Sequence, residues 1–156
     1  MERDGGGMST VAATASSEFT PLRARGARLL RLPVVRDDRG CLVWGEAGTQ
    51  LPFEPTRFWS VFGVPPGESR GDHAHRLLHE VLVCLRGSCL VSVDDGVARD
   101  EVVLDDAGLG LYVPPLVWSR QHRFSADAVL LVLANERYRA DDYIRDYAEF
   151  TAIAHR

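Results

Sequence analysis

The sequence contains no lysine, and all 18 of its basic residues are arginines. The missing amine excludes Schiff-base catalysis and a P-loop, since both require a lysine side chain. The chain has 22 acidic residues and a net charge of −4, so it has no overall basic field with which to attract nucleic acid. Arginine side chains can still bind a phosphate locally through two parallel hydrogen bonds.

Cysteines are few, and long apolar runs are absent. Cys41, Cys84 and Cys89 are odd in number and lack the CxxC spacing, so we expect buried, reduced thiols. No apolar run approaches the roughly 20 residues of a membrane helix, so we expect no membrane partner. Residues 1–20 lack the apolar core of a signal peptide and predict a flexible leader on a cytoplasmic protein.

Short apolar segments separated by turn residues make up most of the chain after this leader. They cover residues 27–35, 41–47, 55–64, 79–87, 88–96, 98–108, 109–115, 117–125 and 128–136. About ten strands in one domain predict an all-β sandwich or barrel, and the cupin-type jelly roll is the simplest closure. Near the end, Tyr143, Tyr147, Phe150 and Ala154 recur at helical spacing and predict a short C-terminal helix. We therefore expect a single domain over residues 21–156.

The segment RGDHAH contains His73 and His75, two residues apart. On a strand such residues point to the same face, so both imidazoles enter one cavity if this strand lines a barrel. Imidazole has a pKa of about 6.5 and can take and return a proton near pH 7. Proton transfer, metal binding and simple packing against the barrel wall all remain open for this pair.

The spacing of His73, His75 and Glu80, with a glycine on either side, resembles the first signature of the cupin superfamily of small β-barrels. In metal-binding cupins these three positions are ligands, and a second motif adds a fourth histidine. Here Ser119 occupies the fourth position, and His122 lies three residues further on and would face another way. Because a metal site needs its full set of ligands, we expect no metal.

A narrower resemblance extends from RDDRG to DDYIRDYAEF. Through the segments RGDHAH, HEVLVCLRGSCLVSVDDG, GLYVPPLVW, VLLVLANERY and DDYIRDYAEF, the chain resembles the WxcM-like family that includes dTDP-4-keto-6-deoxyglucose 3,4-ketoisomerases. The resemblance implies an isomerase that moves a carbonyl between C4 and C3 of a nucleotide-linked deoxysugar, in the biosynthesis of amino-deoxysugars. It also implies a cupin fold, no cofactor, and a homodimer in which strands are exchanged between subunits.

The resemblance places the two active-site histidines at His73 and His75. A hydrogen beside a ketone is acidic because its removal gives an enolate, so a base can take the C3 proton and an acid on the same face can protonate C4. We expect His73 to be the base and His75 to relay protons with the sugar oxygens, although the residues alone leave the reverse assignment open.

Substrate binding requires cations for the pyrophosphate and a flat apolar wall for thymine. Arg39 resembles the arginine of the DxRG element, which contacts phosphate in dTDP-sugar cupins. Arg57 and Arg70 lie near the expected cavity mouth and suit phosphate, and Arg70 can also stabilise the enediolate. Trp59 and Trp118 carry rings that can stack on the base.

Three residues depart from the family pattern. Ser60 stands where a tyrosine is expected near the sugar, Glu80 stands where many members have glutamine, and Ser119 replaces a frequent histidine. Three alternatives stay open. A dTDP-sugar 3,5-epimerase would also remove protons beside a 4-ketone in a cupin barrel. Ser60 and the altered motif favour a non-catalytic nucleotide-sugar-binding module, and Glu80 favours a metal-dependent cupin.

Overall fold

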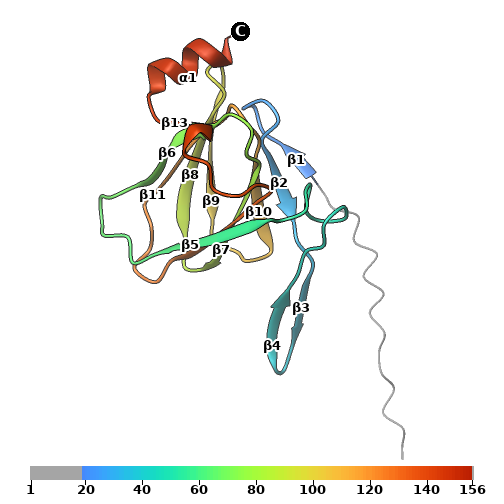
Figure 1. Cartoon of the computed structure of the whole chain (residues 1–156). Coiled ribbons are helices and arrows are strands. Elements are labelled where there is room, and N and C mark those ends of the chain that lie inside the picture. The colour runs from blue at the N-terminus through green and yellow to red at the C-terminus, as the bar shows by residue number, and fades with distance from the viewer. Residues whose placement is uncertain (1–18, 156) are drawn as a thin grey trace, which may run out of the picture.

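The computed structural model describes residues 19–155, which fold into two facing antiparallel β-sheets with a hairpin and a C-terminal helix outside them (Figure 1). The larger sheet contains, in spatial order, β1 (Phe19–Pro21), β2 (Arg28–Arg31), β10 (Leu109–Val113), β7 (Glu80–Arg86), β12 (Val129–Ala134) and β5 (Arg57–Phe62). The second contains β13 (Tyr143–Ile144), β6 (Arg70–His75), β11 (Trp118–His122), β8 (Cys89–Asp94) and β9 (Arg99–Leu104). The predicted all-β, cupin-type jelly roll is confirmed.

The core lies between the two sheets. Leu82 and Leu130 come from the larger sheet, while Val91, Val93 and Leu104 come from the other, and all five are almost completely buried. Buried residues alternate along β8 and β12, as expected for strands that present one face to the core. Each sheet therefore supplies one wall of the interior, and residues of both sheets line a cavity between them.

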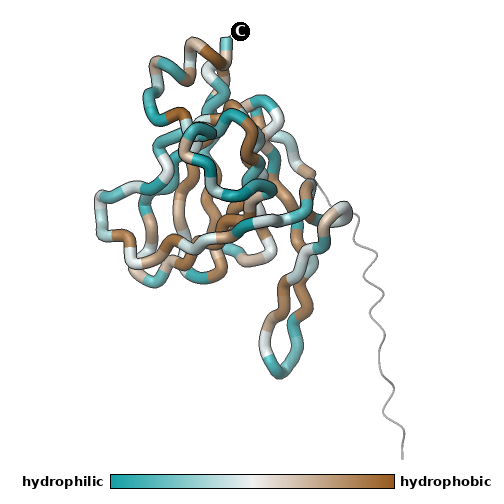
Figure 2. Tube along the Cα trace, viewed as in Figure 1, coloured by the Kyte–Doolittle hydropathy of each residue, from teal (hydrophilic) through white to brown (hydrophobic). Residues whose placement is uncertain are grey.

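A separate hairpin projects from this body (Figure 1). It consists of β3 (Val34–Asp37) and β4 (Gly40–Val43), which pair only with each other within residues 19–155. Figure 2 shows apolar stretches along both of its strands, and Leu42 is 61% exposed. Cys41 is exposed on β4, contrary to our prediction, whereas Cys84 and Cys89 are buried as predicted.

The N-terminal half of the chain differs from the prediction at two boundaries. Residues 27–35 contain parts of two strands rather than one. Pro33 lies between β2 and β3 and has no N–H to donate, so the strand is interrupted there. Phe19, assigned to the leader, belongs to β1 and pairs with Leu30. Residues 1–18 of the predicted leader lie outside the described residues.

The predicted C-terminal helix is present but begins later than the spacing suggested. α1 (Tyr147–Ala154) starts behind Asp146, whose side chain accepts the Glu149 N–H at 2.8 Å. Tyr143, which we placed on the helix, instead pairs with His75 in the sheet, after the short 3₁₀ turn η1 (Ala140–Asp142). No helix in the described part of the chain is long and apolar enough to cross a membrane.

Candidate active site

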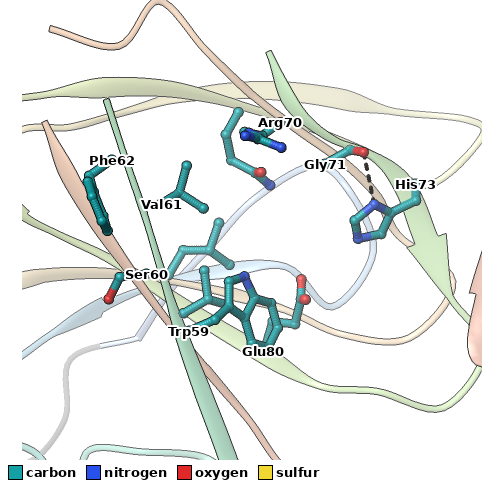
Figure 3. Close-up of a pocket in the computed structure, with 11 residues that line it drawn as sticks. Trp59, Ser60, Val61, Phe62, Arg70, Gly71, His73 and Glu80 are labelled. Atoms are coloured by element: carbon teal, nitrogen blue, oxygen red, sulfur yellow. Dashed lines mark hydrogen bonds between the residues drawn. The ribbon is translucent and has the colours of Figure 1, made fainter. Parts of the chain in front are cut away.

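A cavity of about 480 Å³ opens between the two sheets (Figure 3). Strands β5, β7 and β12 of the larger sheet and β6 and β11 of the other contribute its walls. The lining residues are Trp59, Ser60, Val61, Phe62, Arg70, Gly71, His73, Glu80, Leu82, Gln121 and Val132. The walls combine apolar side chains with a similar share of polar ones, so the cavity suits a polar small molecule.

His73 reaches the cavity from β6 (Figure 3). Its Nδ1 lies 2.9 Å from the Gly71 carbonyl oxygen, and because a carbonyl only accepts, Nδ1 must carry the proton. The lone pair of the neutral ring therefore lies on Nε2. Burial lowers the pKa of His73 below its usual value, and the charge of Glu80 partly opposes this shift. His73 is thus a neutral imidazole with a basic nitrogen at neutral pH.

Gly71 allows this arrangement because it adopts a left-handed backbone (φ +80°) at an irregularity in the pairing of β6 with β11. A Cβ atom there would lie 2.8 Å from the Ser119 carbonyl oxygen, so only glycine fits. The bulged backbone turns the Gly71 carbonyl toward the His73 ring.

His75 lies beside His73 but does not line the cavity. The ring centroids are 4.8 Å apart and the rings meet edge to face, so both side chains do point to the same side of β6. His75 is only 3% exposed, because β13 pairs with the end of β6 and covers it. Its Nδ1 lies 2.9 Å from Asp142 Oδ2. Our expectation that both imidazoles enter the cavity holds for His73 alone.

Glu80 connects His75 to the cavity. Its side chain is buried, lines the cavity, and places Oε1 3.3 Å from His75 Nε2. That nitrogen has no hydrogen-bond partner among residues 19–155 at hydrogen-bonding geometry. The groups Asp142, His75 and Glu80 therefore form a row that begins in the protein interior and ends at the cavity wall.

Sequence reasoning missed Asp142 and Tyr143. The Tyr143 ring centroid lies 5.0 Å from that of His73 and 4.4 Å from that of His75, so it packs against both imidazoles. The segment DDYIRDYAEF carried part of the family resemblance, but no spacing rule relates it to a histidine 67 positions earlier. Only the pairing of β13 with β6 brings the two segments together.

Two of the five predicted substrate-binding residues lie at the cavity. Arg70 and Trp59 line it, from β6 and β5 respectively. Arg57 lies just outside, with its guanidinium 4.6 Å above the Trp59 ring and its buried Nε without a hydrogen-bond partner in the described part of the chain. Arg57 therefore stacks on the Trp59 ring.

Arg39 and Trp118 lie away from the cavity. Arg39 is at the exposed tip of the β3–β4 hairpin, where it pairs with Asp37. Trp118 faces outward from β11 and packs against Tyr147 and Phe150, at centroid distances of 5.2 and 5.5 Å. Because successive residues of a strand alternate in direction, Ser119 points inward and Trp118 cannot. We remove Trp118 from the base-stacking candidates.

The comparisons with known proteins agree with this geometry. The model of the family described as FdtA: WxcM-like, C-terminal, matches residues 25–155. The chain belongs to this family. A curated member from Aneurinibacillus thermoaerophilus, TDP-4-oxo-6-deoxy-alpha-D-glucose-3,4-oxoisomerase, is 44% identical over 123 residues, which are 79% of this chain and 88% of the relative.

Solved structures of similar proteins share the architecture. The QdtA 3,4-ketoisomerase of Thermoanaerobacterium thermosaccharolyticum, solved as a His-to-Asn mutant with TDP-4-keto-6-deoxyglucose, superimposes with a TM-score of 0.81 at 34% identity. The match covers 86% of this chain and 96% of that one. NovW, a 4-keto-6-deoxy sugar epimerase of Streptomyces spheroides, gives a TM-score of 0.70 at 20% identity over 83% of this chain and 73% of its own, which shows a shared fold alone.

Two departures from the WxcM-like pattern fall at the cavity and one lies beside it. Ser60 lines the rim, and Glu80 the wall. The ligand atoms of His73, His75 and Glu80 lie within 4.8 Å of one another, so these side chains are where a cation would fit. Ser119, in place of a fourth histidine, offers a hydroxyl that accepts from Gln121 at 3.3 Å, and His122 faces outward to Ser92, as predicted.

Proposed function

We propose that this protein is a 3,4-ketoisomerase that moves the keto group of TDP-4-keto-6-deoxyglucose, or of a closely related TDP-sugar, from C4 to C3. The names of the curated relative and of the Thermoanaerobacterium enzyme support this reaction. The observation that carries the proposal is His73, a neutral imidazole whose Nε2 lone pair faces a cavity of sufficient size beside a buried second proton carrier.

His73 is the base in this proposal. Its Nε2 takes the C3 proton, and the C–H electron pair becomes the C3=C4 double bond while O4 takes up a proton. O3 then loses its proton as the C3 carbonyl forms, and the protonated His73 returns a proton to C4. The reaction is internally balanced, so it consumes no oxidant or reductant.

The second proton moves between O4 and O3. Since His75 is sealed from the cavity, its relay to the sugar oxygens runs through Glu80, whose carboxylate both lines the cavity and lies 3.3 Å from His75 Nε2. The Glu80–His75 pair gives one proton to O4 and recovers one from O3. Arg70, at the cavity wall, is the candidate donor that stabilises charge on the enediolate.

We propose that the protein is a homodimer in which each hairpin serves the other subunit. The β3–β4 hairpin projects away from its own body, and β5 is an edge strand whose Phe58 and Phe62 are each 70% exposed. Apolar surface on both parts favours contact between two copies. Docking of a partner's hairpin along β5 would bring Arg39 to the cavity rim, where a pyrophosphate would lie. Cys84 and Cys89 as buried thiols are consistent with a reducing compartment such as the cytoplasm.

The experiment that tests this function supplies TDP-4-keto-6-deoxyglucose in D2O and follows the sugar by NMR. The proposal expects a 3-keto product with deuterium at the exchanging carbons. Deuterium at C3 and C5 with the carbonyl still at C4 would indicate an epimerase instead. Binding of TDP by calorimetry without any exchange would indicate a binding module. An equimolar transition metal in protein purified without chelator would favour the metal-dependent alternative.

A further inference from the structure

We propose that Asp142 is a positioning residue of this active site, which orients His75 and keeps its ring proton on Nδ1, so that Nε2, which faces Glu80, is free to take up and release the relay proton. The inference rests on the proposed ketoisomerase function and extends it to the C-terminal segment of the chain. It concerns a residue that touches no substrate and acts through the imidazole.

The Asp142 carboxylate is held from both sides. Its Oδ1 accepts the Leu77 N–H at 2.8 Å, and its Oδ2 lies 2.9 Å from His75 Nδ1. The backbone carbonyl of the same residue accepts the Arg76 N–H at 2.9 Å. The residue is only 7% exposed, and both carboxylate oxygens have a partner. Asp142 is therefore fixed against the loop that follows β6.

The direction of the bond to His75 follows from chemistry. An ionised carboxylate has no proton to give, so His75 Nδ1 must be the donor. The ring is then left with Nε2 as the only nitrogen that can exchange a proton, and Nε2 faces Glu80 Oε1. With the opposite tautomer, the exchangeable nitrogen would face Asp142, away from the cavity, and the relay would be broken.

The neighbouring Asp141 provides a matched control. Its side chain is 74% exposed and forms an ion pair with Arg139 on the surface. The two aspartates share a backbone turn and differ in whether they contact His75. A replacement that acts only by removing negative charge from this turn would affect both positions alike.

The test compares Asp142→Asn with Asp141→Asn. The amide keeps an oxygen for the Leu77 N–H but turns an NH₂ group toward Nδ1, which forces the proton to Nε2. We expect kcat to fall about 100-fold or more, while KM changes by less than about threefold. In ¹⁵N NMR of labelled protein, the His75 proton should move from Nδ1 to Nε2. Asp141→Asn should leave kcat and the tautomer as in the wild type.

Three outcomes would overturn the inference: an unchanged kcat in Asp142→Asn, an equal fall in Asp141→Asn, or a fall in kcat with Nδ1 still protonated. If Asp142→Asn does not fold, the wild-type spectrum decides, since His75 protonated only on Nε2 would contradict the proposed role. A wild type that folds with the expected tautomer but does not turn over TDP-4-keto-6-deoxyglucose would instead refute the proposed function, and the two failures are thereby distinguishable.

Discussion

His73 and His75 lie two residues apart on the same side of β6, yet different groups surround their two imidazole rings. The Nδ1 of His73 faces a neutral carbonyl, and burial lowers its pKa. The imidazole of His75 lies between the carboxylates of Asp142 and Glu80, at 2.9 and 3.3 Å. Burial disfavours the charged form of His73, whereas a carboxylate oxygen lies close to each ring nitrogen of His75. Pairs of titratable groups with opposed environments are a recurrent feature of acid–base catalysis.

Replacing the proposed base provides a direct test at this scale. His73→Asn removes the Nε2 lone pair while keeping a polar side chain, so we expect a folded protein whose turnover falls about 100-fold or more and which no longer exchanges the C3 hydrogen. The measurement is deuterium incorporation by NMR. His122→Asn, which changes an outward-facing histidine bonded to Ser92, should retain full activity. Activity that survives in His73→Asn would show that another group is the base.

A second residue-scale prediction concerns pH. The negative charge of Glu80 raises the pKa of His73, against the larger effect of burial. In Glu80→Gln that charge is lost, so the His73 pKa falls further below about 6.5 and the ring stays neutral at lower pH. The same change removes the carboxylate of the proposed relay, so kcat should also fall, and the pH profile is measured on the remaining activity. The acid limb of the kcat/KM profile should therefore move to lower pH, as should the His73 titration followed by NMR. A shift to higher pH in Glu80→Gln would contradict this charge effect, and Glu101→Gln on the outer face should leave the profile unchanged.

At the scale of elements, the end of the chain supports the site. β13 adds two residues to the edge of β6, η1 places Asp142, and α1 follows at once. Phe150 on α1 is completely buried and packs with Ala74 and Ile144, which belong to β6 and β13. α1, β13 and β6 therefore form one packed unit, so a change that destabilises α1 should also weaken the packing of β13.

Asp146, which caps the N-terminus of α1, allows the stability of this unit to be tested. Asp146→Ala removes the acceptor for the Glu149 N–H, so we expect a loss of about 1 kcal/mol of stability. For a chain of this length, that corresponds to a fall in Tm of about 2–4 °C, measured by calorimetry or circular dichroism. Asp141→Ala removes only a surface ion pair and should change Tm much less. A Tm in Asp146→Ala equal to that of the wild type would mean that the cap does not stabilise α1.

The elements also show how far the sequence could predict this protein. The sequence pattern predicts β8, because Val91 and Val93 alternate with less apolar positions and the structure buries these two residues on the core side of the strand. Tyr143 was assigned to a helix because its spacing fits one, whereas pairing with β6 decides its conformation. Trp118 was placed at the cavity because sequence gives the alternation of a strand but not which face is inside. Asp142 could not be found, since its role depends on a contact between distant segments.

On the scale of the whole molecule, the hairpin outside the body predicts a dimer. Light scattering should give about 34.6 kDa, twice the 17.3 kDa of one chain. Leu42→Asp places a charge on the exposed apolar face of the hairpin, so we expect dissociation to about 17.3 kDa and reduced turnover. A wild type that is monomeric at micromolar concentration would contradict the exchange.

Complementation tests whether the hairpin serves the partner's cavity. His73→Asn and Arg39→Ala should each be weakly active alone. In a mixed dimer, one cavity combines an intact His73 with an intact Arg39 from the other subunit. Random co-assembly should therefore restore about a quarter of wild-type turnover, because half of the dimers are mixed and each has one complete site. No recovery, with mixed dimers verified by mass, would indicate that Arg39 acts within its own chain or not at all.

The contact between His75 and Asp142 also sets an order of events during synthesis. The ribosome must add 67 residues after the imidazole before its carboxylate partner exists, which takes roughly 3–13 s at usual elongation rates. Until then strands β1 to β12 can pair while the tautomer of His75 is not yet fixed by Asp142. Premature termination just ahead of η1 would accordingly yield a polypeptide that keeps the core residues between the two sheets but lacks the carboxylate that completes the proposed proton path.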